Sequence, residues 1–376
     1  MRDTHHRRSI HELLWLGPIG LVCLLLPATL LWQRQPGAAV PLRWLLAAGA
    51  LWLLIWWLAW QRRALNREHA LAAPFPDLGW GTRLTLLRGL LMAALGGFLL
   101  LPASNSWLPA LCYGAAALLD RMDGEVARRT HRCSELGAAL DTLFDALGLV
   151  VAPLVALLLG KLHPSYLLTS AAYYLFIAAS RSRLRRGLPL QPLAPSALRR
   201  TLAGCQMGFV ALALWPPLAA ELTRWIGVFF MLPLLCGFLI DWYQVSGRFD
   251  MRQPQMAQRL SRLRIAMDNW MLPALRLLLA LAILALPNAA APSSLLLALA
   301  FAFCVGFLVR TTGIALLVLL AWHFPGGSVA ALTLWCCAGA VGLLLFGGGR
   351  WCSWRGDDAW LRRIDTGTPQ VVVGRS

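Results

Sequence analysis

Four aspartates between Asp120 and Asp145 have the types and spacing that metal and phosphate chemistry requires. Asp120 and Asp123 are three residues apart, and Asp141 and Asp145 are four apart, so each pair would project from one face of a helix. The stretch holds six of the chain's 17 acidic residues, although apolar sequence flanks it on both sides. Carboxylates in such a place are costly unless a cation neutralises them. Oxygen ligands alone suit hard cations, so we expect Mg²⁺, or Mn²⁺ in its place, as a pair of ions.

Small and basic residues share the helix faces of these aspartates. Gly124 and Ala127 follow the first aspartate by four and seven residues, and Gly137 precedes the third by four. Positions without large side chains leave room for a flat or bulky ligand against the backbone. Arg128 adds a guanidinium fork that suits phosphate oxygens. The pattern therefore indicates a metal-bound phosphate ester.

A plainer interpretation treats the aspartates as solvated helix ends paired with Arg121, Arg129 and Arg132. Isolated acidic pairs usually have that role. The complete spacing, with its small and basic positions, favours a site instead. Glu125 and Glu135 fit no role in it, and we interpret them as surface charge.

The elements that must position the site are membrane-spanning helices. The chain has 376 residues, of which 59% are hydrophobic and 14% charged, and its mean hydropathy is +0.62, which excludes an ordinary soluble domain. Apolar runs close to the roughly 20 residues that cross a bilayer recur throughout. The sequence thus predicts an all-α polytopic membrane protein. Its expected spans are 13–32, 44–60, 84–102, 106–120, 138–160, 165–180, 202–220, 225–243, 269–287, 294–309, 311–323 and 328–346. Residues 294–323, which flank Arg310, could instead form one broken helix.

The net charge of +17 follows the predicted topology, so we expect no nucleic-acid partner. With the N-terminus inside, inside loops carry 28 of the 34 basic residues and outside loops carry four, namely Arg34, Arg43, Lys161 and Arg224. This bias places the aspartates on the cytoplasmic side. We expect a multi-pass protein of the bacterial inner (cytoplasmic) membrane.

The acidic stretch resembles the signature of the CDP-alcohol phosphatidyltransferases. That signature, D-x-x-D-G-x-x-A-R-x8-G-x3-D-x3-D, is met at each specified position from Asp120 to Asp145. The segment TRLTLLR, from Thr82 to Arg88, is similar to the N-x-L-T-x-x-R start of the family's first core span, with Thr82 where asparagine is usual. The resemblance covers about residues 84–245.

The resemblance implies a six-helix core, a homodimer, and a role in phospholipid biosynthesis. The implied reaction moves a phosphatidyl group from CDP-diacylglycerol to an alcohol and releases CMP. By this resemblance, Asp120, Asp123 and Asp141 hold the metals, and Asp145 is the general base on the acceptor hydroxyl. The nucleotide would be admitted by Gly124, Ala127 and Gly137, and its phosphates would contact Arg128.

Basic residues after the sixth expected span are candidates for binding the acceptor. They are Arg181, Arg183, Arg199 and Arg200. Their ordinary role would be topology and attraction to anionic lipid heads, but arginine also pairs bidentately with phosphate. Arg88, at a span start, is either a snorkelling anchor or a further acceptor-binding residue. We rank a phosphorylated polyol, such as glycerol 3-phosphate or inositol phosphate, first among acceptors.

The core is flanked by other blocks. These are an N-terminal two-span hairpin (1–60), an interfacial segment (61–83), a basic cytoplasmic linker (246–268), a four-span block (269–349) and a tail (350–376). The four-span block resembles the small DoxX-like membrane proteins at 275–286, 308–320 and 344–358. Two other functions remain open, a cation-coupled transporter and a catalytically silent lipid-binding scaffold; the transporter would need ionisable residues at several membrane depths.

Overall fold

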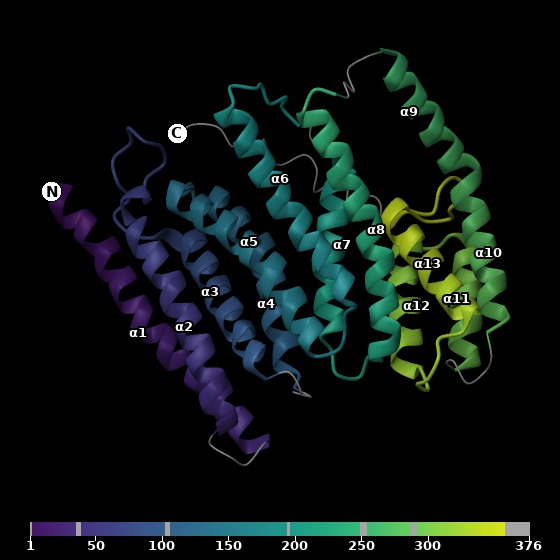
Figure 1. The fold of residues 1–376 in the computed structure, drawn as a ribbon, viewed down its shortest axis with the longest axis horizontal. Coiled ribbons are helices and arrows are strands. Elements are labelled where there is room, and N and C mark those ends of the chain that lie inside the picture. Colours follow the sequence, from purple (N-terminus) through teal and green to yellow (C-terminus); the bar gives the residue numbers. More distant parts are fainter. Residues whose placement is uncertain are drawn as a thin grey trace. The chain divides into compact units, whose positions relative to one another are not determined.

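The computed structural model describes residues 2–34, 39–101, 106–193, 196–248, 254–286 and 292–357. Within these ranges the chain is helical and forms no strand beyond two isolated bridges (Figure 1). It divides into two compact units, Met1–Gly160 with Val210–Pro216, and Lys161–Phe209 with Pro217–Ser376. Each unit is described by itself.

The first unit begins with a pair of long helices, α1 (Arg2–Arg34) and α2 (Ala39–Gln61). Two tryptophans of α2 lie against glycines of α1, where a Cβ would meet an indole ring at 2.7 Å at Gly17 and 2.2 Å at Gly20. Their indole N–H groups donate across the interface, from Trp56 to Leu13 O at 2.7 Å and from Trp52 to Gly17 O at 2.8 Å. Glycine thus admits large rings at this interface, and the rings satisfy their own polar atoms.

Helix α3 (Gly79–Gly96), which a 3₁₀ turn extends through Gly97–Leu100, lies between the N-terminal pair and the helices of the acidic stretch. At one end, Gly96 and Gly97 receive Leu51 and Trp44 of α2, which lie 2.5 and 2.6 Å from where a Cβ would stand. These two glycines therefore allow side chains of α2 to pack closely against this end of α3.

The acidic stretch forms α4 (Leu108–Arg129) and α5 (Glu135–Leu158), both packed on α3. A Cβ at Gly81 of α3 would lie 2.7 Å from the Cβ of Ala127 on α4, and one at Gly89 would lie 2.6 Å from the ring of Phe144 on α5. Ser134 caps α5 by accepting a hydrogen bond from the Gly137 N–H at 3.0 Å. Close approach to α3 thus brings the two acidic helices together.

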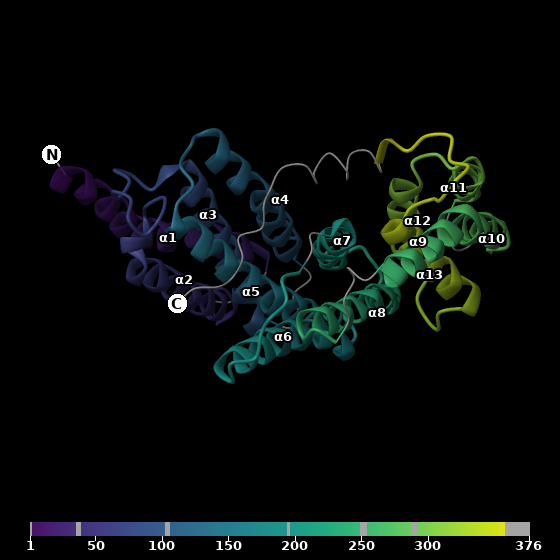
Figure 2. The same ribbon diagram turned by 90° about the horizontal axis from the view of Figure 1, so that it is seen from above.

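The second unit contains the remaining helices, whose later members group together in the view from above (Figure 2). They are α6 (Leu167–Arg185), α7 (Ala197–Ala213, which crosses the unit boundary), α8 (Ala220–Val245), α9 (Pro254–Ala266), α10 (Leu272–Leu284), α11 (Ser293–Val305), α12 (Val309–His323) and α13 (Ala331–Phe346). A π-helical turn, Met267–Met271, joins α9 directly to α10. Part of the predicted linker 246–268 is therefore helix.

Two arginines, the buried Arg276 and the half-buried Arg310, bind carbonyls at the end of the last block. Arg310 donates to the carbonyls of Leu344 and Leu345 at 2.5 and 3.1 Å, at the end of α13. Arg276 donates to Gly348 O at 3.3 Å and Trp351 O at 3.0 Å in the loop that follows. Carbonyls at a helix C-terminus lack intrahelical partners, and the Arg310 guanidinium satisfies two of them in α13, whereas Arg276 fixes the loop.

The all-α polytopic architecture predicted from the sequence is confirmed. Among the described residues, six helices are long and apolar enough to cross a membrane, and three shorter apolar helices follow them. Residues 294–323 form two helices, because Gly306 and Leu308 take left-handed conformations with φ of 72° and 43°. The other predicted spans are helices too, although α4, α6 and α7 carry charged residues at one end.

Candidate functional site

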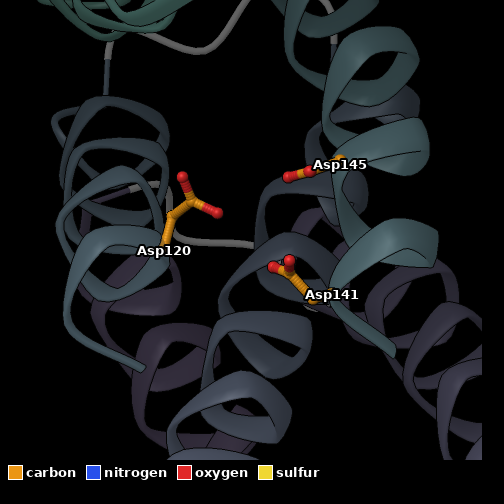
Figure 3. A group of neighbouring side chains, drawn as sticks. All are labelled: Asp120, Asp141 and Asp145. Carbon is orange, nitrogen blue, oxygen red and sulfur yellow. The ribbon is translucent and has the colours of Figure 1, made fainter. Parts of the chain in front are cut away.

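Three of the four aspartates converge between α4 and α5. Asp120 projects from α4, and Asp141 and Asp145 project from α5 into the same space (Figure 3). One carboxylate oxygen from each lies within 4.8 Å of the others. One member of the first acidic pair and both members of the second therefore lie together, although the pairs are distant in sequence.

Arg88 of α3 lies at the centre of this group. Its guanidinium contacts Asp120 Oδ1 at 2.6 Å, Asp141 Oδ1 at 2.7 Å and Asp145 Oδ1 at 2.5 Å. The Arg88 side chain is only 1% exposed, whereas the three carboxylates are 29–48% exposed. Arg88 is thus a buried counter-charge of the site, and the snorkelling interpretation of this residue is wrong.

Asp123 is not a member of the converging trio and is buried at 5% exposure. Its Oδ2 accepts a hydrogen bond from the Thr85 hydroxyl at 2.9 Å, and its Oδ1 accepts one from the Gly124 N–H at 2.6 Å. These bonds compensate for the loss of water around the carboxylate. The trio that converges therefore contains Asp145 rather than Asp123.

The donor chemistry of the trio fits a hard divalent cation. All of its ligand atoms are carboxylate oxygens, and the group contains no imidazole or thiolate. Mg²⁺ and Mn²⁺ prefer such ligands, whereas zinc and copper prefer nitrogen and sulfur. The residues at this site thus fit the metals expected from the sequence.

The residues expected to admit a nucleotide have different surroundings. A Cβ at Gly124 would meet only the flexible end of Arg128, at 3.3 Å. Ala127 instead faces Gly81, and a Cβ at Gly137 would lie 3.2 Å from the hydroxyls of Ser134 and Thr82. Of the three small positions, Gly124 is the one with open space beside it, and the other two are needed for close packing.

Charged residues around the aspartates pair among themselves. Arg128 and Arg129 contact Glu125 at 3.0 and 2.7 Å, and hydrogen bonds from these two arginines lower the pKa of Glu125. Arg132 contacts Asp77 at 2.9 Å, and Glu135 contacts Arg67 at 3.3 Å. Arg129 and Arg132 are therefore engaged with acids outside the site, contrary to the plainer interpretation.

Thr85 is a site residue that sequence reasoning missed, although a signal was present. It is 3% exposed and precedes Arg88 by three residues, so the two lie on one face of α3. Thr85 is also the fourth residue of the TRLTLLR segment. Ser134, which bonds to Thr82 at 3.1 Å, gave only the weaker signal of a serine before an apolar run.

Four of the five arginines expected to bind the acceptor lie in the second unit, and Arg88 lies in the first. Arg199 forms a two-point ion pair with Asp241 of α8, with both N–O distances at 2.8 Å. Arg183 donates to the carbonyls of Pro189 and Ser246 at 3.2 and 3.3 Å. Arg181 is exposed, and Arg200 is half-buried. Arg199 and Arg183 thus have structural partners of their own.

Comparison with known proteins assigns a family to the segment that carries the site. Residues 81–233 match the family model described as CDP-alcohol phosphatidyltransferase, and this confirms the predicted family of the core. No curated protein and no solved structure matches the chain significantly. The match of this segment to the family supports a phosphatidyl-transfer activity in phospholipid synthesis.

Proposed function

We propose that the chain catalyses a Mg²⁺-dependent transfer of a phosphatidyl group from CDP-diacylglycerol to an alcohol, with release of CMP. The observation that carries this proposal is the convergence of Asp120, Asp141 and Asp145 within a segment that matches the CDP-alcohol phosphatidyltransferase family. Mn²⁺ is the alternative metal, and two ions are expected.

Asp120, Asp123 and Asp141 would hold the metal ions. Divalent cations at this point would neutralise charge on the pyrophosphate during in-line displacement. Arg88 holds Asp120 and Asp141 by one oxygen each, which limits the rotation of both carboxylates. Asp123 is oriented by Thr85 and by the Gly124 N–H. Ligands that are held in place by neighbours bind metal with less loss of conformational entropy.

Asp145 would act as the general base. The acceptor hydroxyl oxygen forms a bond to the phosphorus next to diacylglycerol, and its proton passes to the Asp145 carboxylate. The bond from that phosphorus to the CMP oxygen breaks, and CMP leaves with the electron pair. The 48% exposure of the Asp145 side chain supports this role, because a base must be reachable from outside the protein.

Gly124, Ala127, Gly137 and Arg128 would form the nucleotide subsite. Open space beside Gly124 supports contact between its backbone and the ligand. The exposed guanidinium of Arg128 would exchange Glu125 for phosphate oxygens. Arg128 is thus proposed to bind CDP-diacylglycerol by an exchange of anionic partners.

A phosphorylated polyol is the acceptor that we propose first. Positive charge is concentrated at Arg181, Arg183, Arg199 and Arg200. Arg88, the fifth candidate, is 1% exposed and contacts three aspartates, so it is the weakest of the set. The pairing of Arg199 with Asp241 reduces the charge available there, so the exposed Arg181 is the stronger candidate within this set. Glycerol 3-phosphate and inositol phosphate are the acceptors to test first.

The proposed setting is a bacterial inner membrane with the aspartates at its cytoplasmic edge. The six long apolar helices of the described ranges and the family match support a multi-pass membrane protein. The basic loops support the orientation. A lipid-linked donor would reach the site within the bilayer, and a homodimer, implied by the family, would be the functional form.

The test measures CMP release from radiolabelled CDP-diacylglycerol by the purified protein in lipid with Mg²⁺. The acceptor panel contains glycerol 3-phosphate, inositol phosphate, inositol, serine and choline. We expect release with one acceptor and loss of release in EDTA. CDP-diacylglycerol binding without release, for every acceptor, would show a silent scaffold, and metal-driven uptake of a solute would show a transporter.

Asp145→Asn tests the base. We expect turnover to fall by about 10³-fold, because general-base catalysis typically contributes 10²–10⁴-fold, while CDP-diacylglycerol binding is largely kept. Arg129→Gln, which removes an exposed arginine from the end of α4, is the matched control and should retain activity. Full activity of Asp145→Asn would show that another group takes the proton.

A further inference from the structure

The loop between α2 and α3, residues 62–78, packs on the turn that joins α4 to α5. The loop is folded on itself, because the buried Asn66 amide donates to Asp77 O at 2.9 Å and Asn66 O accepts from the Phe75 N–H at 2.8 Å. Arg67 and Pro74 form an isolated bridge across it. A loop with internal bonds of this kind can hold a neighbour in place.

Two ion pairs attach this loop to the two sides of the turn. On the α4 side, Arg132 contacts Asp77 at 2.9 Å, and its guanidinium lies 5.2 Å from the centre of the Phe75 ring. On the α5 side, Arg67 contacts Glu135 at 3.3 Å, and the Glu135 N–H donates to Arg67 O at 2.8 Å. The turn is therefore held at both ends.

A third attachment comes from α1. Glu12 accepts hydrogen bonds from the Leu78 N–H at 3.3 Å and from Arg83 at 3.0 Å, which fixes the first residues of α3. We call Glu12, Asn66, Arg67 and Asp77 the clamp. It joins the starts of α3 and α5 to the end of α4, and all its contacts lie within the first unit.

The positions of Asp120, Asp141 and Asp145 depend on α3 and on the turn between α4 and α5, which the clamp contacts. α4 and α5 each pack mainly on α3 and have few contacts with each other. Their separation is therefore set by α3 and by the turn of residues 130–134. Glu135 precedes Asp141 by six residues, or about 9 Å of helix, so movement at the turn is transmitted to the carboxylates with little loss.

We propose that the clamp is a positioning device for the aspartate site. By fixing the α4–α5 turn and the start of α3, it sets the distance between the carboxylates of α4 and those of α5. Its members make no contact with Asp120, Asp141 or Asp145 and act through the helices that carry them. The effect on turnover rests on the proposed transfer reaction, and the effect on metal binding rests only on the proposed metal ligands. The effect on the turn rests on neither.

The test compares Asp77→Asn, Arg132→Gln and their combination with the matched control Arg129→Gln. A charge exchange, Asp77→Arg with Arg132→Asp, tests rescue. Three quantities are measured on full-length protein in lipid nanodiscs: hydrogen exchange of residues 126–140, Mn²⁺ affinity by electron paramagnetic resonance, and CMP release. Size-exclusion profiles identify any variant that fails to fold.

We expect faster hydrogen exchange at the turn in the single variants and a fall in Mn²⁺ affinity of about tenfold, the lower end of what loss of outer support costs a metal site. Turnover should fall by about tenfold with a smaller change in KM for CDP-diacylglycerol, because misplaced groups reduce the rate more than binding. The charge exchange should recover part of each loss.

Hydrogen exchange and Mn²⁺ affinity equal to those of Arg129→Gln would overturn the proposal, whatever the turnover. Wild-type protein that binds no Mn²⁺ would overturn it as well. If the two measurements change as expected but no wild-type CMP release occurs with any acceptor, the clamp stands and the proposed function falls.

Discussion

Arg88 sets the net charge of the aspartate site before a metal ion binds. Three carboxylates around one guanidinium leave a net charge of about −2, which still attracts a divalent ion. Because Arg88 contacts a single oxygen of each carboxylate, it orients all three without using their full ligand capacity. A fixed cation at this point thus reduces the repulsion among the acids before any ion binds.

Arg88→Gln should destabilise the protein in metal-free buffer. Removing one partner of a buried ionic network costs about 3–5 kcal/mol, and the partial exposure of the aspartates favours the lower end. Mg²⁺ should restore part of the loss, since a bound cation replaces the guanidinium charge. Thermal unfolding in EDTA and in Mg²⁺ measures both effects, with Arg129→Gln as the control. An unfolding temperature equal to wild type in EDTA would contradict this role.

Residue-scale prediction from the sequence succeeded where spacing alone decides the geometry. Helical periodicity fixes which side chains share a face, so it predicted a shared face for Asp120 with Asp123 and for Asp141 with Asp145. Three of the four converge, whereas Asp123 bonds to Thr85 of α3, which spacing alone does not indicate. Arg88 remained ambiguous because an arginine near a span start can point toward water or toward a site. The partner of Arg199, Asp241, lies 42 residues further along the chain on another helix, and no local pattern indicates such a pair.

At the scale of elements, glycine and alanine positions set how closely the helices approach. Gly81 faces Ala127 and lets α3 contact α4, and Gly89 admits the ring of Phe144 from α5. Ala127 was expected to make room for a nucleotide, and it has this packing role as well. Small side chains near a membrane site can thus serve helix packing as much as ligand access.

Gly81→Ala should separate α3 from α4. The new Cβ would lie 2.7 Å from Ala127 Cβ and 3.1 Å from Asp123 O, so the helices must shift at a cost of about 1–3 kcal/mol. The shift would also weaken the bond from Thr85 to Asp123 and lower turnover. Chemical denaturation and CMP release measure the two effects.

Gly114→Ala is the control for that substitution, since a Cβ at this position in α4 meets no atom within 4 Å. It should stabilise the helix by about 0.5–1 kcal/mol, because alanine loses less backbone entropy than glycine. Equal effects of the two substitutions would show that contact at Gly81 does not control the spacing of the helices.

Across the whole chain, hydropathy predicted the helices well because each span is a continuous apolar run. The helical continuation of α10 into residues 254–266 was not predicted, since polar and basic residues there carry no spanning signal. The contacts of the clamp could not be predicted from the sequence either. Asp77 and Arg132 are 55 residues apart, and Glu12 and Arg83 are 71 apart. Contacts of that kind depend on tertiary packing.

The orientation of the whole molecule can be tested with two cysteine positions at opposite ends of α5. Cys133 is exposed in the turn before this helix, and His163 is exposed five residues after its last residue, Leu158. A helix of 24 residues is about 36 Å long, enough to place its two ends on opposite sides of a bilayer.

In a background without other cysteines, an impermeant maleimide should label Cys133 only in inside-out vesicles and His163→Cys only in intact cells. This expectation follows from the excess of basic residues in the loops on the Cys133 side. Labelling of Cys133 in intact cells would place the aspartates outside. CMP would then be released away from the cytoplasm, and the donor and acceptor would have to be supplied from that side.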